Sequence, residues 1–120
     1  MLLIVDDDPR FLNRAQDALG RSEFVLFASN GEQTRSLIAS VGAEITAVLI
    51  DLDLRGEDGF SLIEELHAAF PTLPLIAISG VAQPHVLESA RLLGAVAALP
   101  KPITADWSAA IERSRGRANS

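Results

Sequence analysis

The 120-residue sequence has no cysteine and no tyrosine. Without cysteine the chain has neither disulfide bonds nor thiolate metal ligands or nucleophiles, which is typical of a protein in a reducing compartment. Basic residues are also scarce, since 10 lysines and arginines face 16 acidic residues, and the only basic cluster is Arg113, Arg115 and Arg117. Because nucleic-acid binding needs a basic face that neutralises phosphates, we expect no direct nucleic-acid partner.

Long hydrophobic runs are missing as well. Crossing a bilayer takes roughly 20 consecutive apolar residues, and the apolar segment Met1–Val5 runs into three aspartates rather than into a signal-peptide cleavage region. We therefore expect no membrane association and a cytoplasmic location. A hydrophobic content of 48% at this length suits one domain with a substantial core. We place that domain at residues 1–115, with residues 116–120 as a flexible C-terminal tail or the start of a linker.

Short apolar runs alternate with segments of helical periodicity along the whole chain. Asp8 precedes Pro9 as a helix cap, and Asn30 with Gln33 resembles a capping box. The periodicity places Leu12 and Phe70 among the core-facing helical residues. The apolar runs predict strands at residues 2–5, 24–28, 47–50, 73–78 and 96–99. The periodic segments and their caps predict helices at residues 9–19, 30–41, 60–70, 84–93 and 104–113.

This alternation predicts an α/β fold, a three-layer (βα)5 doubly wound sheet of five parallel strands. In the flavodoxin-like strand order 2-1-3-4-5, ligands bind at the carboxyl ends of strands one and three. Asp6 and Asp7 end the first strand, and Asp51 ends the third. The topology therefore predicts that these three carboxylates meet in one crevice.

Carboxylates gathered in this way repel one another unless a cation neutralises them. Mg²⁺ (or Mn²⁺) suits such a group because it takes oxygen ligands and is often shared with a phosphate. The alternative is that the aspartates at 6–8 only form a turn and a helix cap, and we keep that role for Asp8. Ser79 ends the fourth strand and Lys101 follows the fifth. Each is a weak signal alone, but together with the aspartates they predict a site.

The chain resembles the response-regulator receiver domains of two-component signalling, in particular the chemotaxis-like receivers, over nearly its whole length. The residues that carry the resemblance are Leu3-Ile4-Val5-Asp6-Asp7-Asp8-Pro9, the segment 51–59, Ile78-Ser79-Gly80, Gly94-Ala95 and Lys101-Pro102. The resemblance implies that Asp51 accepts a phosphoryl group and that Asp6 and Asp7 hold the metal. It also implies a metal ligand in the Asp53 main-chain carbonyl, and contacts from Ser79 and Lys101 to the phosphoryl group.

The same resemblance implies the partners. The phosphoryl donor would be a phosphohistidine on a sensor histidine kinase or a phosphotransfer protein. Phosphorylation would switch the Ser79 loop and the face formed by the fourth helix, fifth strand and fifth helix, and so control an output partner or domain that the sequence does not name. Such a receiver is a regulator that assists its own phosphorylation and dephosphorylation rather than a conventional enzyme.

Two other functions compete with this one. The segment Asp51-Leu52-Asp53 also resembles the nucleophile motif of haloacid-dehalogenase-type phosphatases. In those enzymes, however, the acid pair follows the lysine, whereas here it comes first, and no cap insertion is evident. A receiver-like domain used only for docking usually lacks an acid or the lysine, and this chain has all of them.

The chain departs from the pattern of the family at the position of its usual aromatic residue. Many receivers have an aromatic residue three positions before the lysine, where this chain has Ala98. We therefore expect activation to pass through movement of the loop and the fourth helix, or the receiver mainly to relay phosphate. Asp53 and Val81 lie where side chains border the path of the hydrolysing water, so both are candidates for setting the lifetime of the acyl phosphate.

Overall fold

The structure, a computed structural model, describes residues 1–80 and 84–118. Its centre is a parallel sheet in which the strands run in the order β2-β1-β3-β4-β5, which confirms the predicted topology. The strands are β1 (Leu2–Val5), β2 (Val25–Ala28), β3 (Ala47–Asp51), β4 (Leu75–Ser79) and β5 (Ala97–Pro100). Three of them begin one or two residues later than the apolar runs alone predict.

Five helices connect and follow the strands. They are α1 (Pro9–Leu19), α2 (Gly31–Val41), α3 (Gly59–Ala69), α4 (Pro84–Leu92) and α5 (Asp106–Ala118), with a short 3₁₀ turn, η1 (Gly42–Glu44), after α2. The last helix runs past its expected end near Arg113, so the first residues of the segment 116–120 are helical. Asn119 and Ser120 lie outside the described residues, as does Val81. No helix in the described part of the chain is long and apolar enough to span a membrane.

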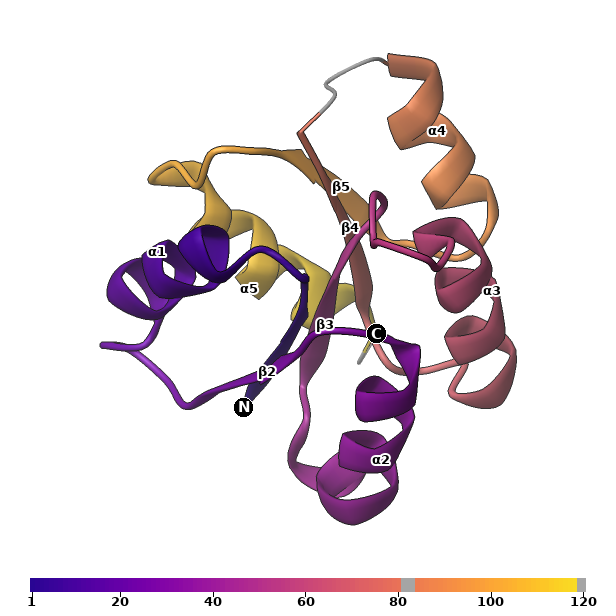
Figure 1. Ribbon diagram of the computed structural model, residues 1–120, viewed down its shortest axis with the longest axis horizontal. Helices are drawn as coiled ribbons and strands as arrows, with labels where there is room; N and C mark the ends of the chain where they lie inside the picture. Colours follow the sequence, from indigo (N-terminus) through magenta and orange to yellow (C-terminus); the bar gives the residue numbers. More distant parts are fainter. Residues whose placement is uncertain (81–83, 119–120) are drawn as a thin grey trace.

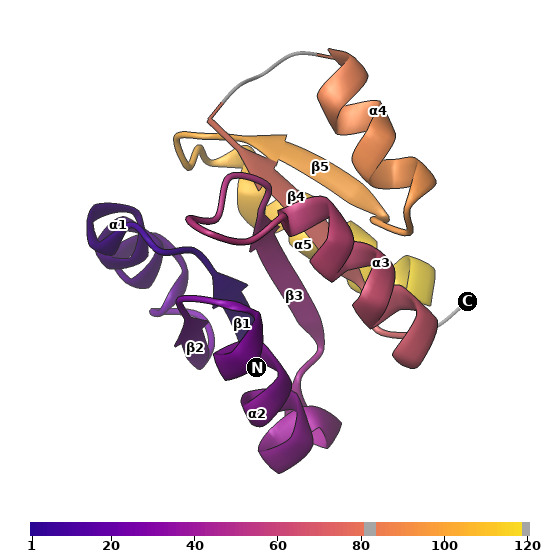
Figure 2. The same ribbon diagram turned by 45° about the vertical axis from the view of Figure 1, so that its right-hand side comes forward.

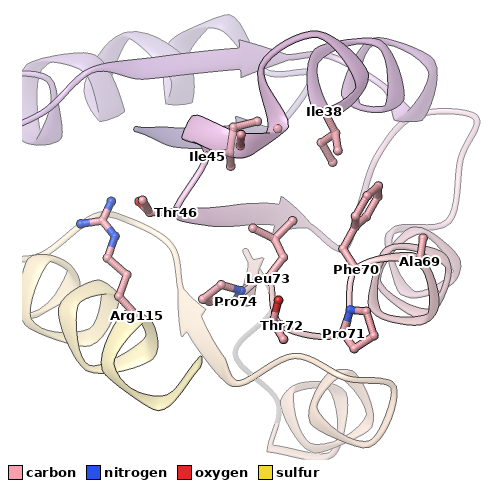
Figure 3. Close-up of a pocket in the computed structure, with 12 residues that line it drawn as sticks. Ile38, Ile45, Thr46, Ala69, Phe70, Pro71, Thr72, Leu73, Pro74 and Arg115 are labelled. Carbon is pink, nitrogen blue, oxygen red and sulfur yellow. The ribbon is translucent and has the colours of Figure 1, made fainter. Parts of the chain in front are cut away.

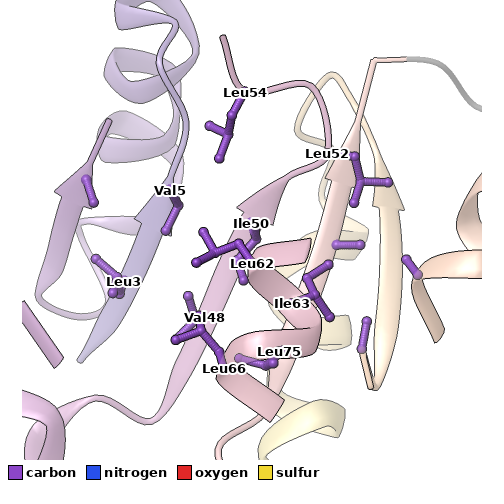
Figure 4. Close-up of a cluster of buried hydrophobic side chains, with 14 of the residues drawn as sticks. Leu3, Val5, Val48, Ile50, Leu52, Leu54, Leu62, Ile63, Leu66 and Leu75 are labelled. Carbon is purple, nitrogen blue, oxygen red and sulfur yellow. The ribbon is translucent and has the colours of Figure 1, made fainter. Parts of the chain in front are cut away.

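The molecule has three layers, as Figures 1 and 2 show. Helices α1 and α5 cover one face of the sheet, and α2, α3 and α4 cover the other. Side chains of β1 and β3 alternate between the two cores: Leu3 and Ile50 face α3, whereas Ile4 and Leu49 face α1 and α5. Figure 4 shows the core beneath α3. Burial on both faces explains why these strands are continuous apolar runs.

Both predicted helix caps are present. The Asp8 carboxylate accepts a hydrogen bond from the Arg10 N–H at 3.0 Å, and the Asn30 side chain accepts one from the Gln33 N–H at 2.8 Å. The Gln33 side chain in turn accepts from the Ser29 N–H at 2.7 Å. These bonds satisfy N–H groups that have no partner within a helix.

Some core predictions were wrong. In α1 the buried side chains are Phe11, Ala15 and Leu19, whereas Leu12 is only partly buried against the same core. Phe70 is 41% exposed because α3 ends at Ala69, so the helical spacing that points Phe70 inward no longer applies. Phe24 is 65% exposed, since it precedes the first paired residue of β2. Periodicity identified the helices but not the position at which each one stops.

Candidate functional site

Three carboxylates meet at the carboxyl ends of β1 and β3. Val5 pairs with Ile50 in the parallel register, so the next residues, Asp6 and Asp51, emerge side by side. With Asp7 they offer oxygen atoms that all lie within 4.8 Å of one another. Asp6 is fully buried and Asp51 is 3% exposed, whereas Asp7 is partly buried. The structure thus brings together the three aspartates that the topology predicts.

Each of these carboxylates is oriented by a backbone N–H group. Asp6 accepts from the Asp8 N–H at 2.9 Å, Asp51 from the Asp53 N–H at 3.2 Å, and Asp7 from the Arg55 N–H at 2.9 Å. Two of the three donors belong to the β3–α3 loop, residues 52–58. The conformation of this loop therefore fixes how Asp51 and Asp7 face the crevice.

Lys101 supplies the positive charge in the interior of the site. Its Nζ lies 2.7 Å from Asp6 Oδ2 and 3.6 Å from Asp51 Oδ2, so the ammonium group bridges two buried carboxylates and contacts Asp6 more closely. The same Nζ lies 4.5 Å from the centroid of the Phe11 ring, a cation–π geometry. The lysine is therefore held from three sides.

Ser79 and Asp53 complete the predicted set. Ser79 is the last residue of β4, one position after Ile78, which pairs with Asp51, and it is 1% exposed. Its main-chain oxygen accepts a hydrogen bond from the Lys101 N–H at 2.8 Å, which joins the ends of β4 and β5. Asp53 is exposed; its N–H donates to Asp51, and its charge adds slightly to the rise of the Asp51 pKa.

The charges of the site do not balance. Asp6, Asp7 and Asp51 carry three negative charges when ionised, and Lys101 carries one positive charge, which leaves a formal charge of −2. The Arg55 guanidinium lies 3.9 Å from Asp7, but it is 94% exposed, so solvent screens its charge. Burial raises the pKa of Asp51 to about 6; the hydrogen bond from Asp53 opposes this rise and the charge of Asp6 adds to it. Ionised Asp51 is therefore held in the folded protein at a cost in free energy.

The pKa of Lys101 reflects opposing effects. Burial lowers it, but the hydrogen bond to Asp6 and the charges of Asp51 and Asp6 outweigh burial, so the pKa lies above the usual lysine value. Lys101 therefore stays protonated at neutral pH and remains available to pair with added negative charge.

The donor set suits a hard divalent cation. Three carboxylates with an uncompensated charge of −2, close together and largely buried, match the preference of Mg²⁺ or Mn²⁺ for oxygen ligands. A divalent ion would neutralise that charge, whereas the Arg55 guanidinium, 3.9 Å from Asp7 and 94% exposed, offsets it only weakly.

Sequence reasoning missed two contributors to the site. Phe11 lies beneath Lys101 and also packs against Trp107, with ring centroids 5.8 Å apart. The i, i+4 spacing of Phe11, Ala15 and Leu19 is a signal that could have placed this ring inward. Arg55 donates its main-chain N–H to Asp7, for which residue type gives no signal, and its exposed guanidinium lies 3.9 Å from the same carboxylate.

A pocket of about 680 Å³ lies away from the carboxylates (Figure 3). It opens at the amino ends of β3 and β4, whereas the carboxylates lie at the carboxyl ends of the strands. Its lining is mainly apolar and includes Ile45, Phe70 and Leu73. It therefore takes no part in the carboxylate site.

Comparison with known proteins settles the family. The family of response regulator receiver domains matches residues 2–110. The chain belongs to this family. It is therefore a receiver domain of two-component signalling, a signalling regulator rather than a conventional enzyme, and the match favours this assignment over the phosphatase alternative. Receiver domains of this kind work with sensor kinases or phosphotransfer proteins and with output domains.

Relatives cover most of this receiver. The photosynthetic apparatus regulatory protein RegA of Rhodovulum sulfidophilum is 31% identical over 98% of this chain and 63% of its own length. The protein PetR of Rhodobacter capsulatus is 32% identical over 84% of this chain and 42% of its own length. The chain spans 28%, 42% and 56% of the first three curated relatives that it matches.

Solved structures agree with the fold. The receiver domain of NtrX from Brucella abortus matches with a TM-score of 0.88 at 26% identity, over 97% of this chain and 98% of that one. A receiver domain from Clostridium thermocellum gives the same TM-score at 25% identity, over 98% and 95% of the two chains. The three-layer, flavodoxin-like architecture is thus shared with known receivers.

Proposed function

We propose that Asp51 accepts a phosphoryl group from a phosphohistidine on a sensor histidine kinase or a phosphotransfer protein. The observation that carries this proposal is the buried arrangement in which Asp51 and Asp6 share Lys101 while Asp7 completes a carboxylate cluster. Burial of three acids around one lysine is costly for stability alone. Such an arrangement is expected for a site that binds a cation and a phosphoryl group.

In the transfer step a carboxylate oxygen of Asp51 forms a bond to phosphorus. The phosphorus–nitrogen bond of the donor breaks, and its electron pair stays on the imidazole. Asp6, Asp7 and Asp51, with the main-chain carbonyl of Asp53, would hold Mg²⁺ or Mn²⁺, which when bound neutralises charge on the transferring group. Asp51 is mainly ionised at pH 7 because its pKa is about 6, as a nucleophilic carboxylate requires.

Lys101 and Ser79 respond to the product. An acyl phosphate on Asp51 carries about −2 in place of −1, so Lys101, now closer to Asp6 than to Asp51, is drawn toward it. The Ser79 hydroxyl binds a phosphoryl oxygen. Because the Lys101 N–H bonds to the Ser79 main-chain oxygen, both strand ends move as a unit.

The output passes through the face formed by α4, β5 and α5. Ala98 is partly buried on β5 and borders a hollow of about 280 Å³ against α4, which is also lined by Pro84, Leu87, Glu88 and Arg91. An alanine has no side-chain rotor that could report the state of Ser79. Movement of the Ser79 loop and α4 therefore carries the signal to an output partner or domain.

The decisive experiment is labelling with a small acyl-phosphate donor in the presence of Mg²⁺. The parent should take up one phosphoryl group, and Asp51→Asn should take up none, because an amide is not a nucleophile toward phosphorus. Asp17→Asn, the same chemical change at an exposed position of α1, is the matched control and should label like the parent. A parent that takes no label would sink the proposal.

Asp53 is a candidate for setting the lifetime of the acyl phosphate. Its carboxylate follows Asp51 by two residues and is exposed, so it can repel an anionic donor or orient the hydrolysing water. The lifetimes of phosphorylated parent and Asp53→Asn distinguish a role from none. Equal lifetimes would remove Asp53 from the mechanism.

A further inference from the structure

The β3–α3 loop is attached to the rest of the molecule on two sides. On the side of the site, its Arg55 N–H donates to Asp7 at 2.9 Å. On the other side, the Glu57 carboxylate accepts from the Gly31 N–H at 2.7 Å, and Gly31 is the first residue of α2. The loop that supplies backbone donors to the carboxylate site is thus tied to a helix outside it.

The contact between Glu57 and α2 is favourable in charge. The Gly31 N–H belongs to the first turn of α2, where a helix carries partial positive charge. One turn further along, an Arg35 guanidinium nitrogen lies 3.7 Å from the other oxygen of Glu57. A carboxylate that faces both groups forms a charge-assisted hydrogen bond, which is stronger than a neutral one.

The identity of Gly31 permits this contact. A Cβ at position 31 would collide with the Glu57 carboxylate. The backbone at Gly31 is ordinary helix, so an alanine there is tolerated by the helix but displaces Glu57. The contact can therefore be broken from either partner, and one of the two changes removes no charge.

The end of the loop is equally constrained. A Cβ at Gly59 would collide with the main-chain oxygen of Asp51, so the first turn of α3 passes directly against the acceptor strand. Between Asp51 and Gly59, Leu52 and Leu54 anchor the loop in the hydrophobic core, and Glu57 is the polar side chain that ties it to α2. The N–H groups that orient Asp51 and Asp7 lie between these fixed points.

We propose that Glu57 is a positioning residue for the carboxylate site: it ties the β3–α3 loop to α2 so that the Asp53 and Arg55 N–H groups stay on Asp51 and Asp7. Its effect on cation binding rests on the function proposed above, whereas its effect on the loop does not. Glu57 acts through the loop and contacts no reacting atom.

The test compares four variants of the full chain. Glu57→Ala and Gly31→Ala each remove the contact, the second without changing charge and as a safeguard if the first folds poorly. Glu57→Gln keeps an oxygen that can accept the Gly31 N–H. Glu65→Ala is the control, because Glu65 bonds Arg35 at 2.6 and 2.8 Å without holding the loop.

The first measurement is hydrogen exchange of the Arg55 amide. We expect it to accelerate about 10-fold in Glu57→Ala and Gly31→Ala, the loss expected for one charge-assisted hydrogen bond. Glu57→Gln, which keeps the hydrogen bond but not its charge, should accelerate exchange less than the two contact-breaking variants, and Glu65→Ala should exchange like the parent. Parent-like exchange in both contact-breaking variants, or equal acceleration in Glu65→Ala, would overturn the proposal.

The second measurement is the dissociation constant for Mg²⁺, by calorimetry without any phosphoryl donor. We expect a rise of about 3- to 10-fold in Glu57→Ala and Gly31→Ala, a smaller rise in Glu57→Gln, and none in Glu65→Ala. Faster Arg55 exchange with unchanged Mg²⁺ affinity would also overturn the positioning role. A parent that binds Mg²⁺ and shows these effects but takes no label would refute the proposed function and leave this inference standing.

Discussion

Two clusters of ion pairs lie on neighbouring parts of this receiver, and they differ in exposure. In the Lys101 cluster, formed by Asp6, Asp7, Asp51 and Lys101, Asp6 is 0% and Lys101 21% exposed, and the charges do not balance. In the α2–α3 cluster, Arg35 is 48% and Glu65 46% exposed, and water solvates both. An exposed pair adds little to stability, whereas buried charges depend on their partners. Ion pairs of similar length should therefore contribute differently to the free energy of unfolding in the two clusters.

The largest effect should come from removing the positive charge of Lys101 from the Lys101 cluster. Lys101→Met leaves Asp6 fully buried without a counter-charge, and should lower the free energy of unfolding by about 3 kcal/mol. Urea unfolding at pH 7 without metal measures this. Arg35→Met is the matched change in the exposed cluster and should cost much less. Equal losses in the two variants would contradict the distinction between the clusters.

The next effect concerns the ionisation of Asp51. Because burial raises its pKa in the folded protein from 3.8 to about 6, folding is disfavoured once Asp51 ionises. Between those two pH values the folded protein binds the Asp51 proton more tightly than the unfolded chain does. The free energy of unfolding is therefore highest below pH 4, and the contribution of Asp51 is lost as pH rises through 6.

Asp51→Asn removes this penalty and should be more stable than the metal-free parent by up to about 3 kcal/mol at pH 7. The difference should vanish near pH 4. Urea unfolding of both proteins across this range, with a chelator present, gives the answer. Asp17→Asn serves as control, and a stability difference between Asp51→Asn and the parent that does not vary with pH would show that Asp51 is not strained by ionisation.

A bound divalent cation should reduce the free-energy cost of keeping Asp51 ionised in the folded protein. At ten times its dissociation constant, Mg²⁺ should raise the free energy of unfolding of the parent by about 1.4 kcal/mol, as expected for binding to the folded state alone. Asp7→Asn, which removes one carboxylate of the cluster, should require more Mg²⁺ for the same gain. An identical Mg²⁺ dependence in Asp7→Asn and the parent would remove Asp7 from the cation site.

The smallest effect should come from the exposed cluster. Glu65→Gln breaks the two-bond pair with Arg35, and should change stability slightly, with the change disappearing at 1 M salt. Thermal unfolding at low and high salt measures it. A loss as large as that of Lys101→Met would show that exposure is the wrong criterion.

Most of the fold could be predicted because its signals are local. Apolar runs bounded by turn residues gave the strands, and caps such as Asp8 and Asn30 gave the helix starts. The ends were less accurate, as Phe24 and Phe70 show, because a hydrophobic side chain beside a strand or helix looks like one within it. The 3₁₀ turn after α2 was also missed, since three residues carry no periodicity.

For the candidate site, the residue types could be predicted from the sequence but the contacts could not. The residue types at the strand ends, Asp6, Asp7, Asp51, Ser79 and Lys101, were readable because parallel strands deliver their last residues to one edge. The contacts that hold the site were not readable. Gly31 and Glu57 are 26 residues apart in sequence, and no local pattern indicates that one donates to the other.

The sequence by itself determined the order of strands and helices and the chemistry at each strand end, because both follow from short-range patterns. Only the tertiary structure decided that Lys101 lies closer to Asp6 than to Asp51, that Phe11 supports it, and that burial raises the pKa of Asp51. Distances and burial depend on how all the layers pack together. For this receiver, they turn a set of aspartates into a site with an unbalanced charge.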